Sequence, residues 1–499
     1  MIDIVWLKRD LRLTDHAPLL HASHTSDPLV LLYIIEPMLI NDPHYDSRHW
    51  RFIWQSLQDI QDQLDGVNAK LHIFFGDAVT VFNTLHHKHG IHAIYSHEEI
   101  GIEVTYQRDQ AILEWTQAHQ IDWHEYQFGA VIRGAKHRRD WDKRWKTVMR
   151  GPLANTPLER VNWCALTIDP ELQPPQSLLN DWQRVDTAFQ LGGAKQAWQT
   201  LDDFHHQRGI DYYWNISSPL NSRKYCSRLS PYLAWGNISL REMYQTLLEN
   251  WNKTGWRRSL IALASRLHWH CHFIQKFDNE HRMQWQPVNR AYHDFPYHNA
   301  NSVECQKKLA AWQQGKTGYP LIDASMRCLI ATGYINFRSR AMLVSFLCHH
   351  LMVDWRLGVT HLAKLFLDFE PGIHYAQFQM QAGVVGTHTI RIYNPTKQAE
   401  EKDPSAEFIY QWLPELHALP TPLAHRPWLI TDMEQQMFDF TLGSDYPKPI
   451  VDIDKTGRNA RELLWEYRHR PLVKKESRRI LRQHVKPSKK KSSTSLSKV

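Results

Sequence analysis

The chain has 499 residues, too many for one hydrophobic core, and is expected to fold as two domains. Hydrophobic residues make up 42% and charged residues 22%, the balance of an ordinary globular protein in water. Apolar runs stop well short of the roughly 20 residues that a membrane span needs, and no secretory signal opens the chain. These features argue against a membrane or secreted protein and predict a cytoplasmic one, which we expect to be a monomer.

The six cysteines form no Cys-x-x-Cys pair, and none follows Cys348, which argues against a zinc knuckle or a C-terminal iron–sulfur site. Reduced, mostly buried thiols are therefore expected. The formal charge of +7 is uneven, because ten Lys and Arg from Lys474 onward face only Glu476. Such a basic end is typical of proteins that bind nucleic acid, although a solvated terminus gives the same pattern.

Residues 1–131 alternate short β-rich segments with helical patterns, which predicts a parallel, doubly wound α/β sheet. Ligands of such sheets bind at the carboxyl ends of the strands. No Gly-x-Gly-x-x-Gly follows a strand, which disfavours a Rossmann-type dinucleotide site here. The predicted strands are Ile2–Leu7, Leu29–Ile35, Lys70–Phe75, His92–His97 and Ile121–Tyr126, and the clearest helices are Arg48–Leu64, Ala78–His89 and Glu103–His119.

Beyond this sheet the pattern changes twice. Residues 132–200 contain five prolines that interrupt regular structure, and we interpret them as an interdomain linker. Residues 201–485 show mainly helical periodicity and predict an all-helical domain, while residues 486–499 are Ser/Lys-rich and predict a basic disordered tail. The clearest helices are Arg257–Phe277, Pro320–Ala331, Ser339–Val353 and Gly358–Phe366.

Two short motifs carry local chemistry. In Trp6–Asp15, WLKRDLRLTD, a strand ends in a charged loop, and Thr14 or Asp15 is placed to cap the next helix. In Cys226–Gly236, CSRLSPYLAWG, hydroxyl groups and backbone amides open a helix with Pro231 in its first turn, an arrangement suited to an anion. Taken alone, the second motif is as well explained by an ordinary capped helix.

Three further blocks follow in order, at residues 312–327, 333–356 and 368–416. With Cys226–Gly236 they resemble the flavin-binding domain of photolyases and cryptochromes, and Trp6–Asp15 resembles the opening of their antenna domain. Departures from the usual pattern resemble those of a prokaryotic photolyase-like side branch. The resemblance implies an α/β antenna domain over residues 1–131, an all-α FAD-binding domain over residues 201–485, and blue-light chemistry.

The resemblance also implies which residues hold FAD. Arg340 and Asp368 would form an ion pair beside the flavin ring, and His374 would face its N5 atom, where photolyases generally have Asn. An imidazole there could titrate near neutrality, which predicts pH-sensitive redox behaviour. Cys226 stands where a Thr is usual. The implied cofactor-binding residues are Tyr213, Cys226, Ser227, Arg228, Leu229, Ser230, His270, Arg340, Asp368, Phe369, Glu370 and His374.

The lesion-binding side matches only in part. Trp269 corresponds to the Trp that packs on a flipped-out pyrimidine dimer, and its helix face combines charge with aromatic rings. At the positions of Arg266, Phe337 and Met380, however, the family's dimer-repair enzymes carry a Glu, an Asn and a second stacking Trp, respectively. The implied DNA-contacting residues are Arg266, Trp269, Phe337, Arg338, Met380 and Gln398. For the nearby His268, His270 and His272 we favour buried, hydrogen-bonded histidines over a metal site, and no metal is predicted.

The family's chain of three tryptophans that reduces the flavin is incomplete. Trp355 matches the middle member and Trp285 the outer one, but Phe378 occupies the inner position and cannot readily donate an electron. Tyr375, Tyr334 or Trp269 are candidates to replace it. The implied catalytic residues are thus Trp269, Trp285, Trp355 and His374.

The leading functional hypothesis is light-dependent DNA repair, in which FAD-mediated electron transfer splits UV-induced pyrimidine dimers, as in a deoxyribodipyrimidine photolyase-like lyase. The partner would be UV-damaged DNA, with single-stranded DNA as a candidate, and the lesion type stays open between cyclobutane dimers and 6-4 products. The alternative is a cryptochrome-type blue-light photoreceptor with little repair activity; a third is a FAD-binding protein with vestigial light chemistry. A second antenna chromophore, a folate, deazaflavin or flavin, is also compatible with the family.

Overall fold

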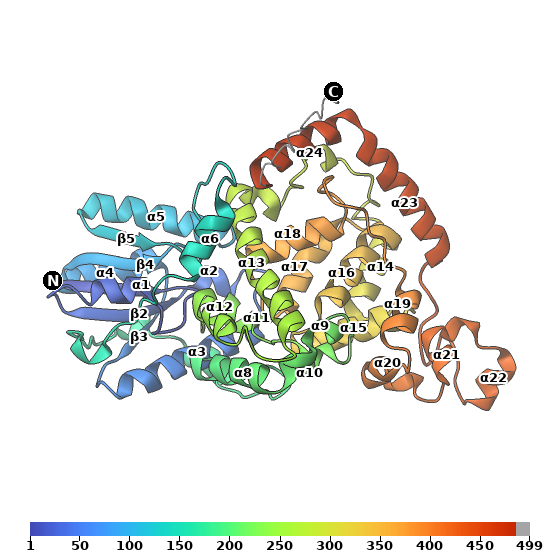
Figure 1. The fold of residues 1–499 in the computed structure, drawn as a ribbon, viewed down its shortest axis with the longest axis horizontal. Helices are drawn as coiled ribbons and strands as arrows, with labels where there is room; N and C mark the ends of the chain where they lie inside the picture. Colours follow the sequence, from blue (N-terminus) through green and yellow to red (C-terminus); the bar gives the residue numbers. More distant parts are fainter. Residues whose placement is uncertain (486–499) are drawn as a thin grey trace, which may run out of the picture.

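A computed structural model describes residues 1–485 of the chain and shows a sheet domain beside a larger helical domain (Figure 1). The sheet has five parallel strands in the order β3-β2-β1-β4-β5, which confirms the predicted topology. Each observed strand lies within one residue of its prediction at either end. The strands are β1 (Ile2–Leu7), β2 (Leu29–Ile35), β3 (Leu71–Phe75), β4 (Ile91–His97) and β5 (Asp122–Tyr126).

Helices cover both faces of this sheet, because successive side chains of each strand point to opposite faces. Alternate residues of β1 and β2 belong to two separate buried cores. One core includes α1 (Ala17–Ala22) and α3 (Ser47–Asp65), and the other includes α4 (Ala78–His89) and α5 (Glu103–His119). The domain is therefore doubly wound, as predicted.

The loop after β1 differs from its prediction in one detail. Neither Thr14 nor Asp15 caps α1; the ring Nδ1 of His16 accepts the backbone N–H of Leu19 at 3.1 Å. Asp15 instead accepts Nε of Arg241 at 2.9 Å, so its carboxylate ties the loop to the helical domain. A buried imidazole, which the usual capping rules do not favour, has taken over the capping role.

The segment expected as a linker, residues 132–200, contains helices of its own. They are α6 (Trp141–Met149), α7 (Gln176–Trp182) and the first half of α8 (Ala194–His206), which crosses the boundary expected at residue 200. Both α7 and α8 pack on α3 of the sheet domain, while α6 packs on α12 (Leu240–Glu249). The segment thus wraps the molecule rather than hanging free.

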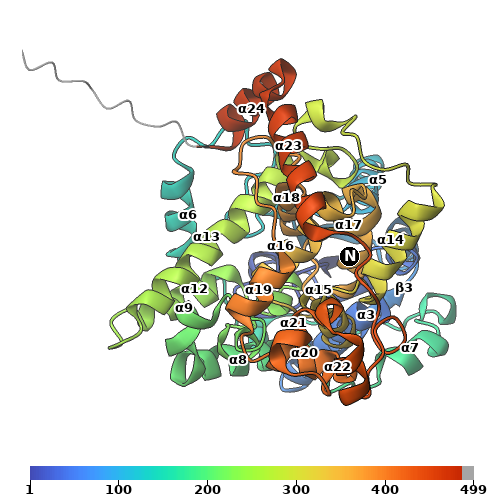
Figure 2. The same cartoon turned by 90° about the vertical axis from the view of Figure 1, so that its right-hand side faces the viewer.

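The described residues from 201 to 485 contain no strand and many helices, as expected for the second domain. In Figures 1 and 2, α16, α17 and α18 lie inside this domain, and α23 and α24 run along its outer side. The helices needed below are α11 (Ser230–Ala234), α13 (Arg257–Asn279), α16 (Phe337–Ser345), α17 (Trp355–Leu365), α18 (Pro371–Gln381), α23 (Ile453–His469) and α24 (Pro471–His484).

The helix predicted over Ser339–Val353 is shorter than expected. Helix α16 ends at Ser345 and continues as a five-residue π-turn, Phe346–His350. Ser345 Oγ accepts the N–H of Tyr393 at 3.1 Å, and the Nε2–H of His350 donates to the carbonyl of Tyr393 at 2.9 Å. The π-turn therefore anchors a distant loop, and such turns are frequent at functional sites.

Within residues 1–485 no helix is long and apolar enough to cross a membrane. All six cysteines are free and all except Cys164 are buried, as predicted. Residues 486–499, where a basic disordered tail is predicted, lie outside the described part of the chain.

Candidate flavin and DNA site

One pocket of the helical domain gathers six of the residues predicted from the sequence. Its walls come from α16, α17, α18 and the segment that joins the last two. The six are Phe337, Arg340, Asp368, Phe369, Glu370 and His374. Residues about 30 positions apart in the sequence therefore line the same pocket, as the family motifs predicted.

The ion pair between Arg340 and Asp368 is present. Nη2 of Arg340 lies 2.7 and 2.6 Å from the two carboxylate oxygens of Asp368, whose side chain is nearly buried. The guanidinium also lies over the ring of Phe366, 3.7 Å from its centroid. A charge-assisted pair held between an aromatic ring and a largely apolar pocket is costly to bury, which points to a role beyond stability.

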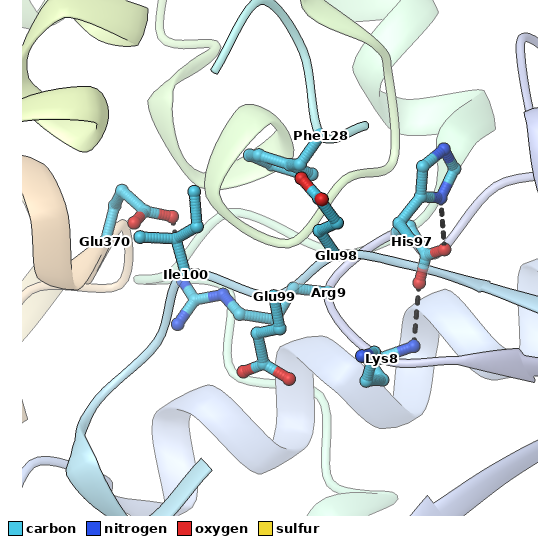
Figure 3. Close-up of a pocket in the computed structure, with 9 residues that line it drawn as sticks. Lys8, Arg9, His97, Glu98, Glu99, Ile100, Phe128 and Glu370 are labelled. Carbon is cyan, nitrogen blue, oxygen red and sulfur yellow. Dashed lines mark hydrogen bonds and ion pairs between the residues drawn. The ribbon is translucent and has the colours of Figure 1, made fainter. Parts of the chain in front are cut away.

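Glu370 connects this pocket to the sheet domain. Its carboxylate caps α18 by accepting the N–H of Gly372 at 3.3 Å and lies 3.5 Å from Nη2 of Arg9. Arg9, drawn beside Glu370 in Figure 3, belongs to the loop after β1 and donates to the carbonyl of Phe369 at 2.5 Å. Burial raises the pKa of Glu370, and Arg9 opposes that shift. The opening motif of the chain thus positions the flavin pocket directly.

His374 is neutral in this pocket, which corrects the expectation that it titrates near neutrality. Its Nε2–H donates to the carbonyl of Val359 at 2.8 Å. Burial lowers the pKa of His374 to about 3, because the charged imidazolium would lose its water. The predicted pH-sensitive redox behaviour between about pH 6 and 8 therefore has no titrating group at this position.

The Cys226–Gly236 motif presents uncommitted donors. The hydroxyls of Ser227 and Ser230 form no hydrogen bond with any residue between 1 and 485, and Nη1 of Arg228 is buried without a partner. Arg228 adopts a left-handed backbone conformation, φ 60°, and its guanidinium lies 3.6 Å from the ring centroid of Tyr334. Two free hydroxyls and a buried, unsatisfied guanidinium form a donor set that fits a diphosphate.

An aromatic face lies open on α13. Trp269 is 47% exposed, and its ring centroid lies 5.5 Å from that of Phe273 and 4.9 Å from that of His272. Arg338 does not share this face: it reaches Oε1 of Gln398 at 3.1 Å and Oγ of Ser217 at 3.3 Å. An exposed aromatic face is therefore present on α13, and its use as a stacking platform for a flipped-out base stays a prediction.

Comparison with known proteins agrees with this geometry. Residues 3–144 match the family model of DNA photolyase, and residues 262–466 match that of the FAD-binding domain of DNA photolyase. The chain belongs to the photolyase/cryptochrome family. It has an FAD-binding domain of the photolyase type, and the unsatisfied donors described above fit that cofactor.

Relatives in this family carry two kinds of name. A cryptochrome DASH from Synechocystis is 28% identical over 92% of this chain and 97% of its own length. A deoxyribodipyrimidine photo-lyase from Vibrio cholerae is 26% identical over 90% and 96%. Among solved structures, a cryptochrome from Synechocystis sp. PCC6803 superposes with a TM-score of 0.81 at 25% identity, covering 93% of this chain and 99% of its own.

An archaeal photolyase from Sulfolobus tokodaii, solved with two FAD molecules, superposes with a TM-score of 0.76 at 26% identity, covering 93% of this chain and 100% of its own. These likenesses support the family and its fold, but they do not separate a repair enzyme from a photoreceptor.

Seven of the twelve residues that the family pattern assigns to FAD do not line this pocket, among them Tyr213 and His270. Tyr213 is 46% exposed and packs edge-on against Trp214. His270 lies on α13 against an interdomain cavity that His97 and Phe128 also line, and burial lowers its pKa to about 4. Its Nδ1 has no partner within residues 1–485, so it stays a candidate donor to the cofactor. Cys226 and Leu229 are buried.

The residues assigned to the family's electron route lie in and near the pocket, and the interruption of that route at Phe378 stays a prediction. Phe378 lines the pocket, with its ring centroid 5.8 Å from that of His374. Trp355 is buried and Trp285 is partly exposed; Nε of Arg356 donates to the carbonyl of Trp285 at 2.9 Å, and its guanidinium lies over the Trp355 ring. The two outer members of a family-type chain are therefore placed near one another.

Tyr375 has a hydrogen-bonded chain of its own. Its hydroxyl lies 2.5 Å from Nε2 of His44, and Nδ1 of His44 lies 2.6 Å from Oδ1 of Asp42. Burial raises the pKa of Tyr375, so the phenol stays protonated. Of the candidates to replace the inner tryptophan, Tyr375 is therefore the one with an adjacent base in the structure.

Sequence reasoning missed Gln377 and Gln381, which line the pocket beside His374. They follow His374 by three and seven positions on α18 and share its face. Their spacing from His374 is the signal in the sequence that places them on the same helix face.

A buried group of Asp10, His16 and His97 has the composition of a metal site. Both histidines lie within 2.8 Å of one oxygen of Asp10. Because Nδ1 of His16 accepts a backbone N–H, its Nε2 must carry the proton that points at Asp10, and it is not free to bind a metal. Although burial raises the pKa of Asp10, these hydrogen bonds hold it well below its usual range. The group is a hydrogen-bonded carboxylate.

Proposed function

We propose that this chain is a light-dependent DNA repair enzyme, a deoxyribodipyrimidine photolyase-like lyase that splits UV-induced pyrimidine dimers. The observation that carries the proposal is the combination of the Arg340–Asp368 pair and free phosphate donors with an exposed aromatic face at Trp269. A cofactor site and a surface for an extruded base on one domain are what such repair requires.

The chain's own residues would hold and orient the cofactor. Ser227, Arg228 and Ser230 would bind its diphosphate, and Arg340 and Asp368 would fix the ring edge. Reduced FAD, when bound, supplies the electron that light drives into the pyrimidine pair. His374, kept neutral by burial, would present its unprotonated Nδ1 to the ring without adding a charge.

DNA would meet the same domain from outside. Trp269 would stack on the extruded pyrimidines, next to Arg266 and Met380, while Arg338 and Gln398 would contact the strand and Phe337 would close the pocket wall. Replacing the usual Glu and Asn by Arg266 and Phe337 removes hydrogen bonds to a base and adds charge for phosphate. This change favours single-stranded DNA, where backbone and stacking contacts dominate.

Electrons that keep the flavin reduced would pass through Trp285 and Trp355, with Tyr375 as the inner donor. His44 is placed to take the hydroxyl proton when Tyr375 is oxidised, and Asp42 to stabilise the resulting imidazolium. The geometry supports this role because a buried phenol cannot lose an electron cheaply unless its proton leaves too.

A cryptochrome-type photoreceptor is the second candidate. Phe337, Arg266 and Met380 depart from the repair pattern, and relatives at comparable identity are named cryptochrome. In that case the direct contact between Arg9 of the sheet domain and Glu370 beside the flavin would carry the light signal between domains.

Several finer points belong to the same proposal. We propose a cytoplasmic monomer with domains at residues 1–131 and 201–485, a linker at 132–200 and a basic tail at 486–499. A second chromophore would bind at the carboxyl ends of β1 and β4, where the strand order reverses, beside the pocket in Figure 3.

Light-dependent repair can be measured directly. Protein with reduced FAD is mixed with UV-irradiated oligothymidine and exposed to blue light, with dark and unirradiated samples as controls. Recovery of thymine absorbance in the light alone supports repair, and Trp269→Ala should abolish it while keeping the flavin. Tight DNA binding without recovery would favour the photoreceptor.

A further inference from the structure

A wide groove lies on the outer side of the helical domain. Its volume is about 620 Å³, and its walls are the loop Thr389–Tyr393 and one face of α23, which faces the viewer in Figure 2. Its polar and aromatic lining consists of Arg338, Arg391, Tyr393, Arg461, Trp465 and Arg468. No carboxylate lines it.

The α23 wall is built by helical spacing. Arg461, Trp465 and Arg468 follow one another by four and three residues, so they share one face of the helix. The indole of Trp465 is 60% exposed, although a tryptophan of this size usually finds cover in a folded protein. An aromatic ring framed by two arginines on an open wall is a ready platform for a flat, anionic ligand.

Three of the groove's four arginines have side chains without a protein partner. Within residues 1–485, the guanidinium groups of Arg391, Arg461 and Arg468 form neither a hydrogen bond nor an ion pair. By contrast, Arg338 is hydrogen-bonded to Gln398 and Ser217, and Arg470, just beyond the end of α23, pairs with Glu466. Guanidinium groups left open together in one groove create a strong local positive potential.

His388 immediately precedes the loop that forms one wall of the groove. Burial lowers the pKa of His388 to about 4, and the charges of Lys276, Arg391 and Arg468 lower it further. This histidine is therefore neutral near neutral pH and adds no charge to the groove.

The two walls are held in place by the π-turn at Phe346–His350. His350 donates to the carbonyl of Tyr393 in the loop, and its other ring nitrogen lies 2.9 Å from Oγ1 of Thr456 on α23. The two walls of the groove are therefore held together before a ligand arrives, which lowers the entropy cost of binding.

The groove also begins beside the flavin pocket. Phe337 lines that pocket and the next residue, Arg338, lines the groove, both in the first turn of α16. A strand whose damaged bases enter the pocket would lead directly into the groove.

We propose that this groove binds an unpaired segment of a nucleic-acid strand, with phosphates on Arg391, Arg461 and Arg468 and one base stacked on Trp465. The identity of the strand as lesion-containing DNA rests on the proposed function. Bases of a duplex are already stacked on their neighbours, so only an unpaired base can offer its face to the indole. The groove therefore makes single-stranded DNA the preferred substrate.

Dark binding of a fluorescein-labelled oligothymidine strand, compared with the same strand in a duplex, tests the proposal on the full chain loaded with FAD. Trp465→Ala should weaken single-strand binding by about tenfold and duplex binding by less than about twofold. Trp465→Phe, which keeps a ring, should stay within about threefold of the wild type. Trp198→Ala, at a partly exposed tryptophan on α8, is the matched control and should change neither affinity.

Equal losses on both forms of DNA, or no loss on either, would overturn the proposal. The readout needs no light, so it separates the groove from the repair reaction. If the protein repairs DNA and Trp465→Ala binds the single strand as tightly as the wild type, only the groove proposal is wrong. If single-strand binding depends on Trp465 but no repair occurs, only the proposed repair function is wrong.

Discussion

Charges are arranged in opposite ways at the strand ends of the sheet domain and in the groove of the helical domain. At the strand ends, Arg108 is buried between Glu36 and Glu99, at 2.6 and 2.5 Å from their oxygens. In the groove, Arg461 and Arg468 face open space with no carboxylate on either wall. The same residue type thus serves in one place as an internal tie and in the other as an open binding group.

The difference shows how to tell structural from functional charge in this fold. A buried charge must be paired, since desolvation otherwise costs several kcal/mol. An exposed cation costs little and gains most when an external anion arrives. Arg340 lies between these limits: it is paired with Asp368 yet borders the flavin pocket, so it combines both roles.

Breaking the buried ion pairs of Arg108 with Glu36 and Glu99 should have the largest effect on stability. Arg108→Ala leaves Glu36 and Glu99 buried without a counter-charge, and the free energy of unfolding should fall by about 3–5 kcal/mol. Urea unfolding measures it, with exposed Arg184→Ala as control. A loss of stability below about 1 kcal/mol would mean that these ion pairs are not buried as described.

Removing Arg340, the arginine that borders the flavin pocket, should weaken the binding of FAD. Arg340→Ala leaves Asp368 unpaired at the pocket, and FAD affinity should fall by about 2–5 kcal/mol. Fluorescence titration of the apoprotein with FAD measures it, and Arg184→Ala again serves as control. FAD binding at wild-type affinity would show that the pair does not border the flavin.

The stability of the apoprotein should depend on pH through His374. Its pKa is about 3 in the fold, below the ordinary value of 6.5, so the unfolded chain takes up the proton first. Its contribution is fully present above pH 6.5 and is lost as the pH falls toward 3, by about 1.4 kcal/mol per pH unit. Unfolding of His374→Asn should show a shallower slope between pH 6.5 and 5; parallel curves would contradict the burial.

The electron route gives the last prediction, and its Tyr375→Phe variant has the smallest expected effect. Trp355→Phe should abolish photoreduction if the family route survives, and Tyr375→Phe should slow it by about tenfold, equivalent to about 1.4 kcal/mol. Transient absorption measures both, with Trp198→Phe as an exposed control. Unchanged kinetics in Trp355→Phe would show that another path operates.

Much of the fold was readable from the sequence because strands and helices were periodic. The β1–β5 segments were apolar and short, and α4 and α5 were predicted to the residue. Residues of the flavin pocket could be predicted because the family motifs follow one another along this chain. The π-turn was not, since it depends on Tyr393, a contact 43 residues from His350.

Other features depend on burial, which one sequence does not display. His374 could not be assigned a charge until the fold showed how far its ring is removed from solvent. Trp465 looked like one more tryptophan among 21, and only the position of the Thr389–Tyr393 loop shows that its face stays open. Tyr375 gained its role from His44, which lies in the other domain.

The most direct test of the whole account is the initial rate at which thymine absorbance recovers under blue light, measured on dimers in single-stranded and duplex oligonucleotides of the same sequence. The account predicts recovery on the single strand at a rate at least about tenfold above that on the duplex. No recovery on either substrate, in protein that retains reduced FAD and binds the single strand, would contradict it.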